Sequence, residues 1–338
     1  MLIPYIQKVS DRHSLSQDEA AAAMSEMLSG ETSDVHLAAF LVALRTRGET
    51  ADELSGFLSM VRERMTRVDC DDECAVDLCG TGGDGSNSFN LSTAAALVVA
   101  AGGVTVAKHG NRAISSRSGS ADFLQALGCK IDGTKEHAES DLKNKRFAFL
   151  FAPNFHTAAK AVAPVRRTLG MRTVFNLLGP LANPAGVRRQ LVGVFHAQWV
   201  EPVAGTLSQT GSTHVMAVHG DGGLDEISAD GPTLVCEYGE GKTRRKTIQP
   251  EDLGVQRTSR TAVRGGTPEE NASRFLAVAE GEEPELREWI VANAAPAFYL
   301  SGRATALRRG AAMARDVITS GALQSFLPSL LNGDSARA

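Results

Sequence analysis

Apolar residues recur at spacings of three and four through the first part of the chain. The stretch D-V-H-L-A-A-F-L-V-A-L-R shows this helical period most clearly, and Ser16, followed by acidic residues, is typical of a helix N-terminus. Gly30 and the G-E-T of residues 48–50 interrupt the pattern. Residues 16–65 therefore predict a run of helices separated by turns.

The pattern changes at residue 74, where short apolar runs begin to alternate with helical segments. Runs at residues 74–79, 104–107 and 146–153 predict strands, because they are short and strongly apolar. Residues 92–102 and 118–127, which lie between them, have the composition of helices. Strands that alternate with helices predict a mainly parallel sheet.

Later segments extend the same fold. Strands are predicted at residues 190–195 and 214–219, and residues 233–249, with G-E-G-K inside, predict an antiparallel hairpin at the sheet edge. Further helices are predicted at residues 157–169, 268–281, 285–300 and 304–321. The fold class is therefore α/β with a mainly parallel central sheet.

Length, charge and cysteine usage limit the number of domains, the kind of partner and the cellular setting that we expect. A chain of 338 residues predicts two domains, and 43% hydrophobic with 22% charged residues is ordinary for a globular protein. A net charge of −4 favours a small anion over nucleic acid as the partner. The five cysteines include no C-x-x-C pair, which indicates a reducing, cytoplasmic setting. We expect no signal peptide and no membrane span, since the most apolar run, residues 94–107, contains two glycines.

A glycine-rich segment follows the first predicted strand. Gly80, Gly82, Gly83 and Gly85 lie where α/β sheets bind ligands, and glycine lets backbone N–H groups converge on phosphate oxygens. The segment lacks the Gly-Lys-Ser/Thr end of a P-loop. It does satisfy G-x-G-x-x-G, but no acidic residue stands between residues 86 and 121 to bind the ribose of a dinucleotide. A phosphate site and a tight structural turn both remain open on this pattern.

Short polar side chains surround this turn and the loop after the next strand. Around the turn they are Asp84, Ser88, Asn90, Ser92 and Thr93, which is more than a turn needs. The second loop begins at Lys108 and should reach the same sheet edge, where lysine and hydroxyls suit a phosphate. Taken alone, this second loop is equally typical of a solvated surface.

Four ordered motifs resemble those of the anthranilate phosphoribosyltransferase family. They are D-L-C-G-T-G-G-D-G-S-N-S-F-N-L-S-T, K-H-G-N-R-A-I-S-S-R-S-G-S-A-D-F-L-Q-A-L-G, P-V-R-R-T-L-G-M-R-T-V-F-N-L-L-G-P-L-A-N-P and G-L-D-E-I-S. The resemblance covers nearly the whole chain. It implies a small helical domain, residues 1–68 with a helical insertion near 162–189, and a larger α/β catalytic domain, residues 69–338, of the nucleoside phosphorylase/phosphoribosyltransferase type. It also implies a homodimer formed through the helical domains.

The resemblance also implies where the substrates lie. Anthranilate would meet Gly80, Asn111 and Arg166, whose planar guanidinium suits a carboxylate, and Mg²⁺ would be held by Ser92, Asp225 and Glu226. By themselves, the two acids are typical of an ordinary exposed loop. Phosphoribosyl pyrophosphate would contact Gly80, Gly83, Asp84, Ser88, Asn90, Leu91, Ser92, Thr93, Lys108, His109, Gly110, Asn111, Arg112, Ala113, Ile114, Ser115, Ser116 and Ser120.

The implied reaction is displacement of pyrophosphate by the amine of anthranilate, which gives N-(5-phosphoribosyl)anthranilate in tryptophan biosynthesis. An arylamine is already a neutral nucleophile, so no covalent intermediate is required and no catalytic side chain is assigned. His109 and His156 are expected to line the pocket.

The chain departs from the family's motif beside the expected anthranilate pocket. It has His156-Thr157-Ala158-Ala159-Lys160 where the family commonly has H-P-A-M-K.

Two rival functions use the same scaffold. A pyrimidine nucleoside phosphorylase would carry a K-H-S-T-G-G-type loop, whereas this chain has K-H-G-N-R. A non-catalytic paralogue that binds nucleic acid could use basic stretches at Arg117, residues 143–146 and residues 244–246. The net acidity counts against this second rival, because such short basic runs are usually solvated surface.

Overall fold

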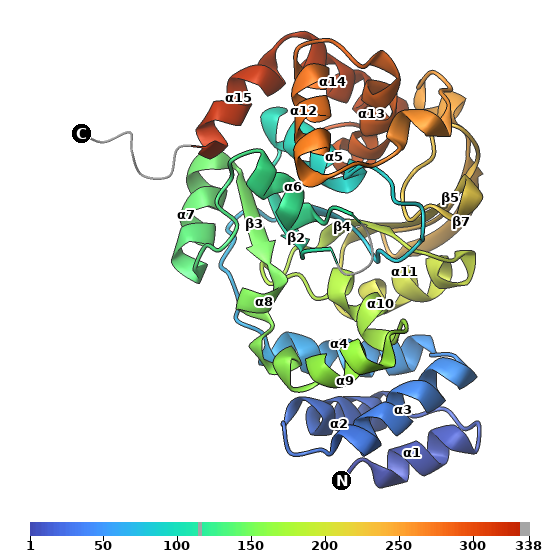
Figure 1. The fold of residues 1–338 in the computed structure, drawn as a ribbon. Helices are drawn as coiled ribbons and strands as arrows, with labels where there is room; N and C mark the ends of the chain where they lie inside the picture. Colours follow the sequence, from blue (N-terminus) through green and yellow to red (C-terminus); the bar gives the residue numbers. More distant parts are fainter. Residues whose placement is uncertain (114–116, 332–338) are drawn as a thin grey trace.

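Four helices at the N-terminus form one end of the molecule in the computed structural model, which describes residues 1–113 and 117–331 (Figure 1). Ser16 and Thr50 cap two of the helices in capping boxes with Glu19 and Glu53, so the sequence itself fixes where these helices begin. The helices predicted within residues 16–65 are thus confirmed. The four elements are α1 (Ile3–Ser10), α2 (Gln17–Leu28), α3 (Asp34–Arg47) and α4 (Ala51–Arg64).

A second group of helices, inserted between two strands of the sheet, packs on this N-terminal bundle. The group comprises α8 (Ala152–Phe155), η1 (Thr157–Ala161), α9 (Ala163–Leu169) and α10 (Val174–Leu181). Val165 and Phe175 share a hydrophobic cluster with Phe40 and Phe57 of the bundle. The single helix predicted at residues 157–169 is wrong, since a 3₁₀ turn ends before Val162 and a new helix starts. Pro164 explains the break, because proline has no backbone N–H to continue a helix but fits its first turn.

A seven-stranded sheet forms the centre of the α/β domain, in the order β3-β2-β1-β4-β5-β6-β7. The first five strands along the chain are parallel, and β6 and β7 form an antiparallel hairpin at one edge, as predicted. Glu240 and Gly241 turn this hairpin with φ of 52° and 72°, the geometry of a type I′ turn. The strands are β1 (Val76–Gly80), β2 (Val106–Gly110), β3 (Phe147–Phe151), β4 (Arg189–Gly193), β5 (His214–Gly220), β6 (Thr233–Gly239) and β7 (Lys242–Ile248).

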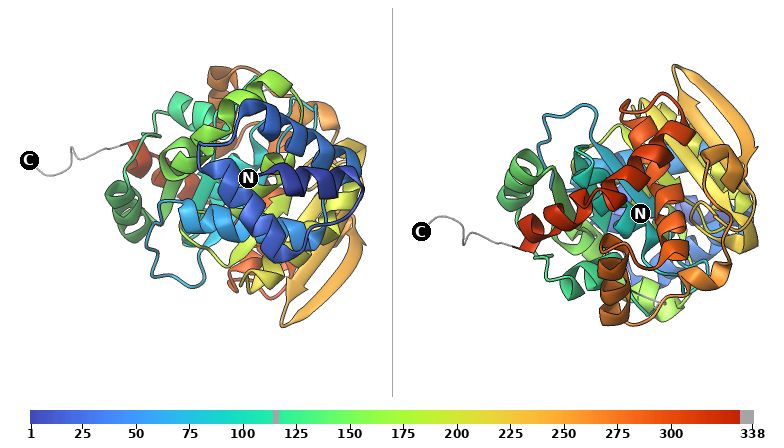
Figure 2. Two further views of the ribbon diagram at one scale, coloured as in Figure 1. Left: turned by 90° about the horizontal axis from the view of Figure 1, so that it is seen from below. Right: turned by 90° about the horizontal axis from the view of Figure 1, so that it is seen from above.

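Helices cover both faces of the sheet. Successive residues of a strand therefore face two different hydrophobic cores in turn, one on each side of the sheet. Leu78 packs into a core with α5 (Leu91–Ala101) and α13 (Pro284–Leu300), whereas Cys79 faces a core with α11 (Val200–Gln209) and the helical bundle. The N-terminal helices lie in front when the molecule is seen from below and the C-terminal helices when it is seen from above, so the two groups lie at opposite ends (Figure 1 and Figure 2). The remaining helices near the first core are α6 (Ser120–Ala126), α12 (Pro268–Ala279), α14 (Leu307–Thr319) and α15 (Ala322–Leu331), and α7 (Lys135–Lys145) lies beside β3.

The apolar pattern does not predict α1, α7, α10, α11 or α15, and α7 and α11 show why. In α7 only Ala138 and Leu142 are buried, which leaves too thin an apolar stripe to recognise. In α11 Pro202 suggests a break, but it stands in the first helical turn, where proline is tolerated. None of the described helices is both long and apolar enough to cross a membrane.

Side chains of α4 attach the helical bundle to the α/β domain. Arg62 donates to the carbonyl oxygens of Leu181 and Thr210, at 2.8 and 2.9 Å, and these residues lie at the C-terminal ends of α10 and α11. Ser55 donates to Gln209 Oε1 at 2.7 Å. A cation suits the negative end of a helix dipole, so Arg62 holds three helices together.

A buried carboxylate on β6 joins β5, β6, β7 and α13. Glu237 accepts hydrogen bonds from His214 Nε2 at 3.1 Å, Lys246 Nζ at 2.7 Å and Tyr299 OH at 2.8 Å. The bond from His214, supported by those from Lys246 and Tyr299, lowers the pKa of Glu237 from 4.5 to about 2 against the opposing effect of burial. The folded protein therefore stabilises the ionised form of Glu237 more than the unfolded chain does.

Glu237→Gln should lower the free energy of unfolding by about 2–3 kcal/mol at pH 7. Because the folded pKa lies below the unfolded value, this contribution is complete above pH 4.5 and is lost as pH falls towards 2. Denaturant unfolding at pH 7 and pH 3 would measure the change, with Glu240→Gln on the exposed hairpin turn as control. An equal loss at both pH values would contradict the role of the charge.

Candidate active site

Three strands end at one edge of the sheet, where the residues that follow them come together. β1 ends at Gly80, β4 at Gly193, and the loop after β5 brings Asp225 against both of them. A Cβ at Gly80 would lie 2.4 Å from Asp225 Oδ2, and one at Gly193 would lie 1.6 Å from the backbone oxygen of Asp225. Only glycine permits this approach, so the two strand ends are shaped to receive the acidic loop.

The acidic pair is buried and bound to the glycine-rich segment. Asp225 Oδ2 accepts a hydrogen bond from the backbone N–H of Gly82 at 2.6 Å, and Glu226 Oε1 accepts one from Ser92 at 3.1 Å. Burial raises the pKa of Asp225, with Asp84 adding to the effect, and burial and Asp225 together raise the pKa of Glu226 well above its ordinary value. The folded protein therefore concentrates negative charge that a cation would stabilise.

The donor set fits a hard divalent cation. Asp84, Asp225 and Glu226 offer carboxylate oxygens, and Asp84 Oδ2 is buried without a hydrogen-bond partner among the described residues. The same described residues contain no ready-made group of three His, Cys, Asp or Glu side chains arranged around one point. Mg²⁺ is commonly held by one or two carboxylates together with substrate phosphates and water, which this arrangement matches.

The glycine-rich segment takes a shape that other residues could not easily adopt. Gly82, Gly83 and Gly85 have φ of 65°, 71° and 76°, and the segment leads into the N-terminus of α5. Backbone N–H groups and the helix dipole thus favour an anion here. Asn90 is largely engaged within the protein, since its side chain bonds to Ser118 and Asn271.

An arginine that the sequence motifs do not single out clamps this segment. Arg172 Nη1 donates to the carbonyl oxygen of Gly83 at 2.5 Å, and its guanidinium lies 4.3 Å from the ring centroid of Phe195. Arg172 comes from the connection between α9 and α10, so it joins the helical insertion to the glycine loop. Its separation of 89 residues from Gly83 leaves no local signal by which to find it.

The sequence predicts a loop that begins at Lys108, but β2 extends to Gly110, so Lys108 and His109 lie within the strand and the loop starts after it. Lys108 is 2% exposed, and its ammonium donates to the carbonyl oxygen of His109 at 3.2 Å. Ser120 and Asn111 bond to each other, and Arg112 is paired with Asp122 at 2.7 Å. Ile114, Ser115 and Ser116, which the family motif includes, lie outside the described residues.

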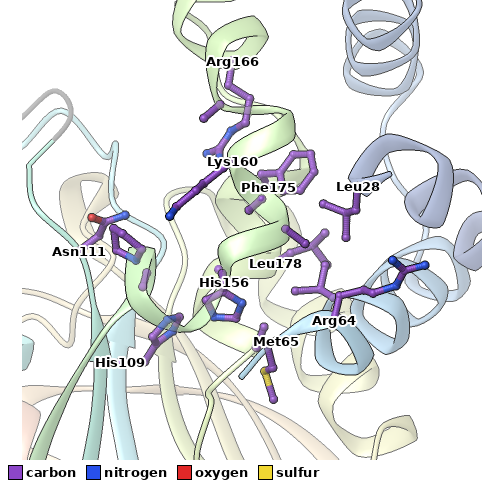
Figure 3. Close-up of a pocket in the computed structure, with 18 residues that line it drawn as sticks. Leu28, Arg64, Met65, His109, Asn111, His156, Lys160, Arg166, Phe175 and Leu178 are labelled. Atoms are coloured by element: carbon purple, nitrogen blue, oxygen red, sulfur yellow. The ribbon is translucent and has the colours of Figure 1, made fainter. Parts of the chain in front are cut away.

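A cavity of about 290 Å³ opens between the helical bundle and the α/β domain, next to this loop (Figure 3). It brings together Asn111, which follows β2, and Arg166 of α9, two of the three residues expected to meet anthranilate. The third, Gly80, is not among the residues that line it. Arg166 lies 5.0 Å from the ring of Phe175, and burial lowers the pKa of its guanidinium. Most of the lining is apolar, contributed by Leu28, Val61, Met65, Ala152, Pro153, Ala158, Ala159, Ala163, Phe175, Leu178, Gly179 and Ala182.

Two neutral histidines stand at the inner end of the cavity. The rings of His109 and His156 are 5.0 Å apart between centroids, and the Nε2 atom of each is buried with no hydrogen-bond partner among the described residues. Burial lowers the pKa of His109 well below its ordinary value and that of His156 to about 4. The altered segment after His156 also lines the cavity, through Ala158, Ala159 and Lys160.

Both domains of the chain match known families. Residues 3–65 match the helical bundle domain, and residues 72–324 the a/b domain, of a glycosyl transferase family. An anthranilate phosphoribosyltransferase from Anaeromyxobacter sp. (strain K) is 48% identical over 331 residues, which cover 98% of each chain.

Solved structures show the same architecture. Anthranilate phosphoribosyltransferase from Thermus thermophilus superposes with a TM-score of 0.91 at 42% identity, over 96% of this chain and 98% of that one. The enzyme from Saccharomyces cerevisiae in complex with PRPP and Mg has a TM-score of 0.86 at 28% identity, over 98% of this chain and 96% of that one. With 48% identity to a relative over 98% of each chain, this chain belongs to the anthranilate phosphoribosyltransferase family.

Proposed function

We propose that this protein is a magnesium-dependent anthranilate phosphoribosyltransferase of tryptophan biosynthesis. It transfers the phosphoribosyl group of phosphoribosyl pyrophosphate to the amine of anthranilate and releases pyrophosphate. The observation that carries the proposal is that the end of β2 joins two sites. His109 lines the apolar cavity that contains Arg166, and the charge of the neighbouring Lys108 acts on Glu226 of the buried acidic pair. The acidic pair with the glycine loop suits a polyphosphate with its cation, and the cavity suits an aromatic acid.

The donor substrate lies between the glycine loop and the loop after β2. Backbone N–H groups of the glycine loop and the positive end of α5 bind its phosphates, and Lys108 adds a buried positive charge. The full set that we assign to this substrate is Gly80, Gly83, Asp84, Ser88, Asn90, Leu91, Ser92, Thr93, Lys108, His109, Gly110, Asn111, Arg112, Ala113 and Ser120, together with Ile114, Ser115 and Ser116.

Magnesium is held by Asp225 and Glu226, with Ser92 beside them. When bound, the ion supplies electrostatic stabilisation of the departing pyrophosphate. The raised pKa values of the two carboxyls are consistent with this role, since a cation relieves the cost of ionising both in a buried site.

The acceptor enters the cavity between the domains. Arg166 binds its carboxylate through two N–H groups, and the apolar walls contact its ring, so the amine points towards the donor near Gly80 and Asn111. The arylamine is already uncharged, so it can attack without a general base, and the neighbouring His156, with a pKa of about 4, brings no positive charge to the cavity. The protein thus acts by positioning and by stabilising the leaving group, with no covalent intermediate.

A steady-state assay with phosphoribosyl pyrophosphate, anthranilate and Mg²⁺ tests the proposal. We expect pyrophosphate release that depends on both substrates and stops when the metal is chelated. Phosphorolysis of a pyrimidine nucleoside instead would identify the phosphorylase alternative. A gel shift with nucleic acid at physiological salt, without transferase activity, would identify the nucleic-acid-binding alternative.

We also propose that the chain divides near residue 68 and forms a cytoplasmic homodimer through its helical part. Ile3, Val35, Val42 and Met171 are exposed apolar side chains on the bundle or the helical insertion, and Val35 is 75% exposed. Among the C-terminal helices, Leu276 and Leu331 are exposed as well. The five cysteines are free, as the reducing setting requires. Light scattering should give twice the 35.7 kDa mass of one chain, whereas a monomeric mass would contradict the dimer.

A further inference from the structure

The two strands that carry the donor-site loops separate before they reach the donor site. β1 and β2 pair only where Val76 meets Val106, although β1 pairs along its whole length with β4, and β2 with β3. The backbone N–H of Val76 still donates to Thr105, but the expected next rungs of this parallel ladder are replaced. They would have used the carbonyl oxygen of Ala107 and the N–H of His109.

Two buried side chains replace the missing strand contacts. Asp77 Oδ1 accepts the N–H of His109 at 3.2 Å, and Asn183 Nδ2 donates to the carbonyl oxygen of Ala107 at 2.8 Å. The two side chains also bond to each other, from Asn183 Nδ2 to Asp77 Oδ2 at 2.7 Å. The remaining amide oxygen of Asn183 accepts the N–H of Ala185 at 2.8 Å. Asp77 is 0% and Asn183 2% exposed, so these bonds are shielded from water.

A buried carboxylate is costly, and the site supplies one compensating charge. Burial raises the pKa of Asp77, and the strongest opposing influence is the positive charge of Lys108, which also acts on Glu226. Asn183 lies just after α10, next to Ala182 in the cavity wall. The Asp77–Asn183 pair therefore lies between the cavity wall and the end of β2, which carries Lys108 and His109.

We propose that Asp77 and Asn183 are positioning residues for the transfer reaction, which hold β2 away from β1 and fix the backbone of Lys108 and His109 at the donor site. This inference rests on the proposed function for its catalytic consequence. The pair touches neither substrate, and acts through the end of β2, which does. Disturbing it should reduce kcat, because a displacement of about 1 Å in a positioned group can lower the rate about a hundredfold.

Variants that exchange aspartate and asparagine at positions 77 and 183 test the role of this pair. In Asn183→Asp, two carboxylates face each other and Ala107 loses its donor, so we expect kcat to fall about a hundredfold. The double variant Asp77→Asn with Asn183→Asp restores a donor and an acceptor between the two side chains and keeps an acceptor for His109. It should recover at least about tenfold of the lost kcat. Ser55→Ala, which removes a buried polar contact in α4, is the control for a general loss of stability.

Hydrogen exchange of residues 107–111 supplies a readout that does not depend on activity. Exchange there should quicken in Asn183→Asp, remain as in the natural protein in Ser55→Ala, and slow again in the double variant. If the natural protein showed no transferase activity but exchange followed this order, the proposed function would fail while the structural inference stood. A double variant no better than Asn183→Asp in both measurements would overturn the inference.

Discussion

Replacing Asp225 and Glu226 together by their uncharged isosteres, Asp225→Asn and Glu226→Gln, should lower turnover about a thousandfold or more. The amides keep the shape of the side chains and can still accept hydrogen bonds from Gly82 and Ser92. They remove both negative charges, however, and with them most of the attraction for a divalent cation. Initial rates over a range of Mg²⁺ concentrations would measure the loss, which excess metal should not fully restore.

The same double variant should be more stable than the natural protein when metal is absent. Burial raises the pKa of both carboxyls, so their ionised forms oppose folding at pH 7. The difference should shrink as pH falls below the ordinary range of carboxyl pKa values, because both proteins then carry neutral side chains. Thermal unfolding with a chelator present would give a higher midpoint, by a few degrees.

Asp221→Asn is the matched control for this pair. Asp221 lies on the same loop but is exposed, and its neutralisation should leave turnover within about twofold. Natural turnover in the double variant would remove Asp225 and Glu226 from the metal site. A lower melting temperature with misfolding would show instead that the charges support the fold.

Arg166→Ala should raise the KM for anthranilate about a hundredfold, and that for phosphoribosyl pyrophosphate far less. Arg64 and Arg166 both line the cavity, but Arg64 is exposed to solvent. The Arg166 guanidinium is partly buried, which strengthens the two parallel hydrogen bonds that it can form to a carboxylate. Steady-state rates with one substrate varied at a time would separate the two constants. Arg166→Lys should recover only part of the loss, because a lysine offers a point charge without the fork.

Arg167→Ala tests whether any positive charge on α9 would be enough to bind the carboxylate of anthranilate. Arg167 is the next residue along the helix and is exposed, so its removal should change neither KM appreciably. Equal increases in both KM values for Arg166→Ala would place Arg166 away from the acceptor. Its contact with Phe175 would then be its main role.

The regular part of the fold could be predicted because it depends on local patterns. Short apolar runs identify β1 to β5, the G-E-G-K turn identifies the hairpin, and Ser16 marks the start of a helix. Family motifs likewise indicate the segments at Gly80 and Lys108. Local patterns fail where a helix buries only two residues, as in α7.

The acidic pair shows what a linear pattern leaves open. Asp225 and Glu226 have the sequence context of an exposed loop, yet both are buried, and each bonds to a residue more than a hundred positions away. Their raised pKa values arise from that burial and from the proximity of Asp84. No local signal carries this information, because desolvation depends on which distant segments cover a side chain.

The sequence by itself determined the glycine-rich segment, the alternation of strands and helices, and the motifs that indicate the family. Tertiary structure alone decided that Arg172 clamps Gly83, that Arg166 and Asn111 share a cavity, and that Asp77 and Asn183 separate two strands. The reason is physical. Secondary structure follows from spacing along the chain, whereas charge, burial and hydrogen bonding at the site depend on contacts between segments that folding brings together.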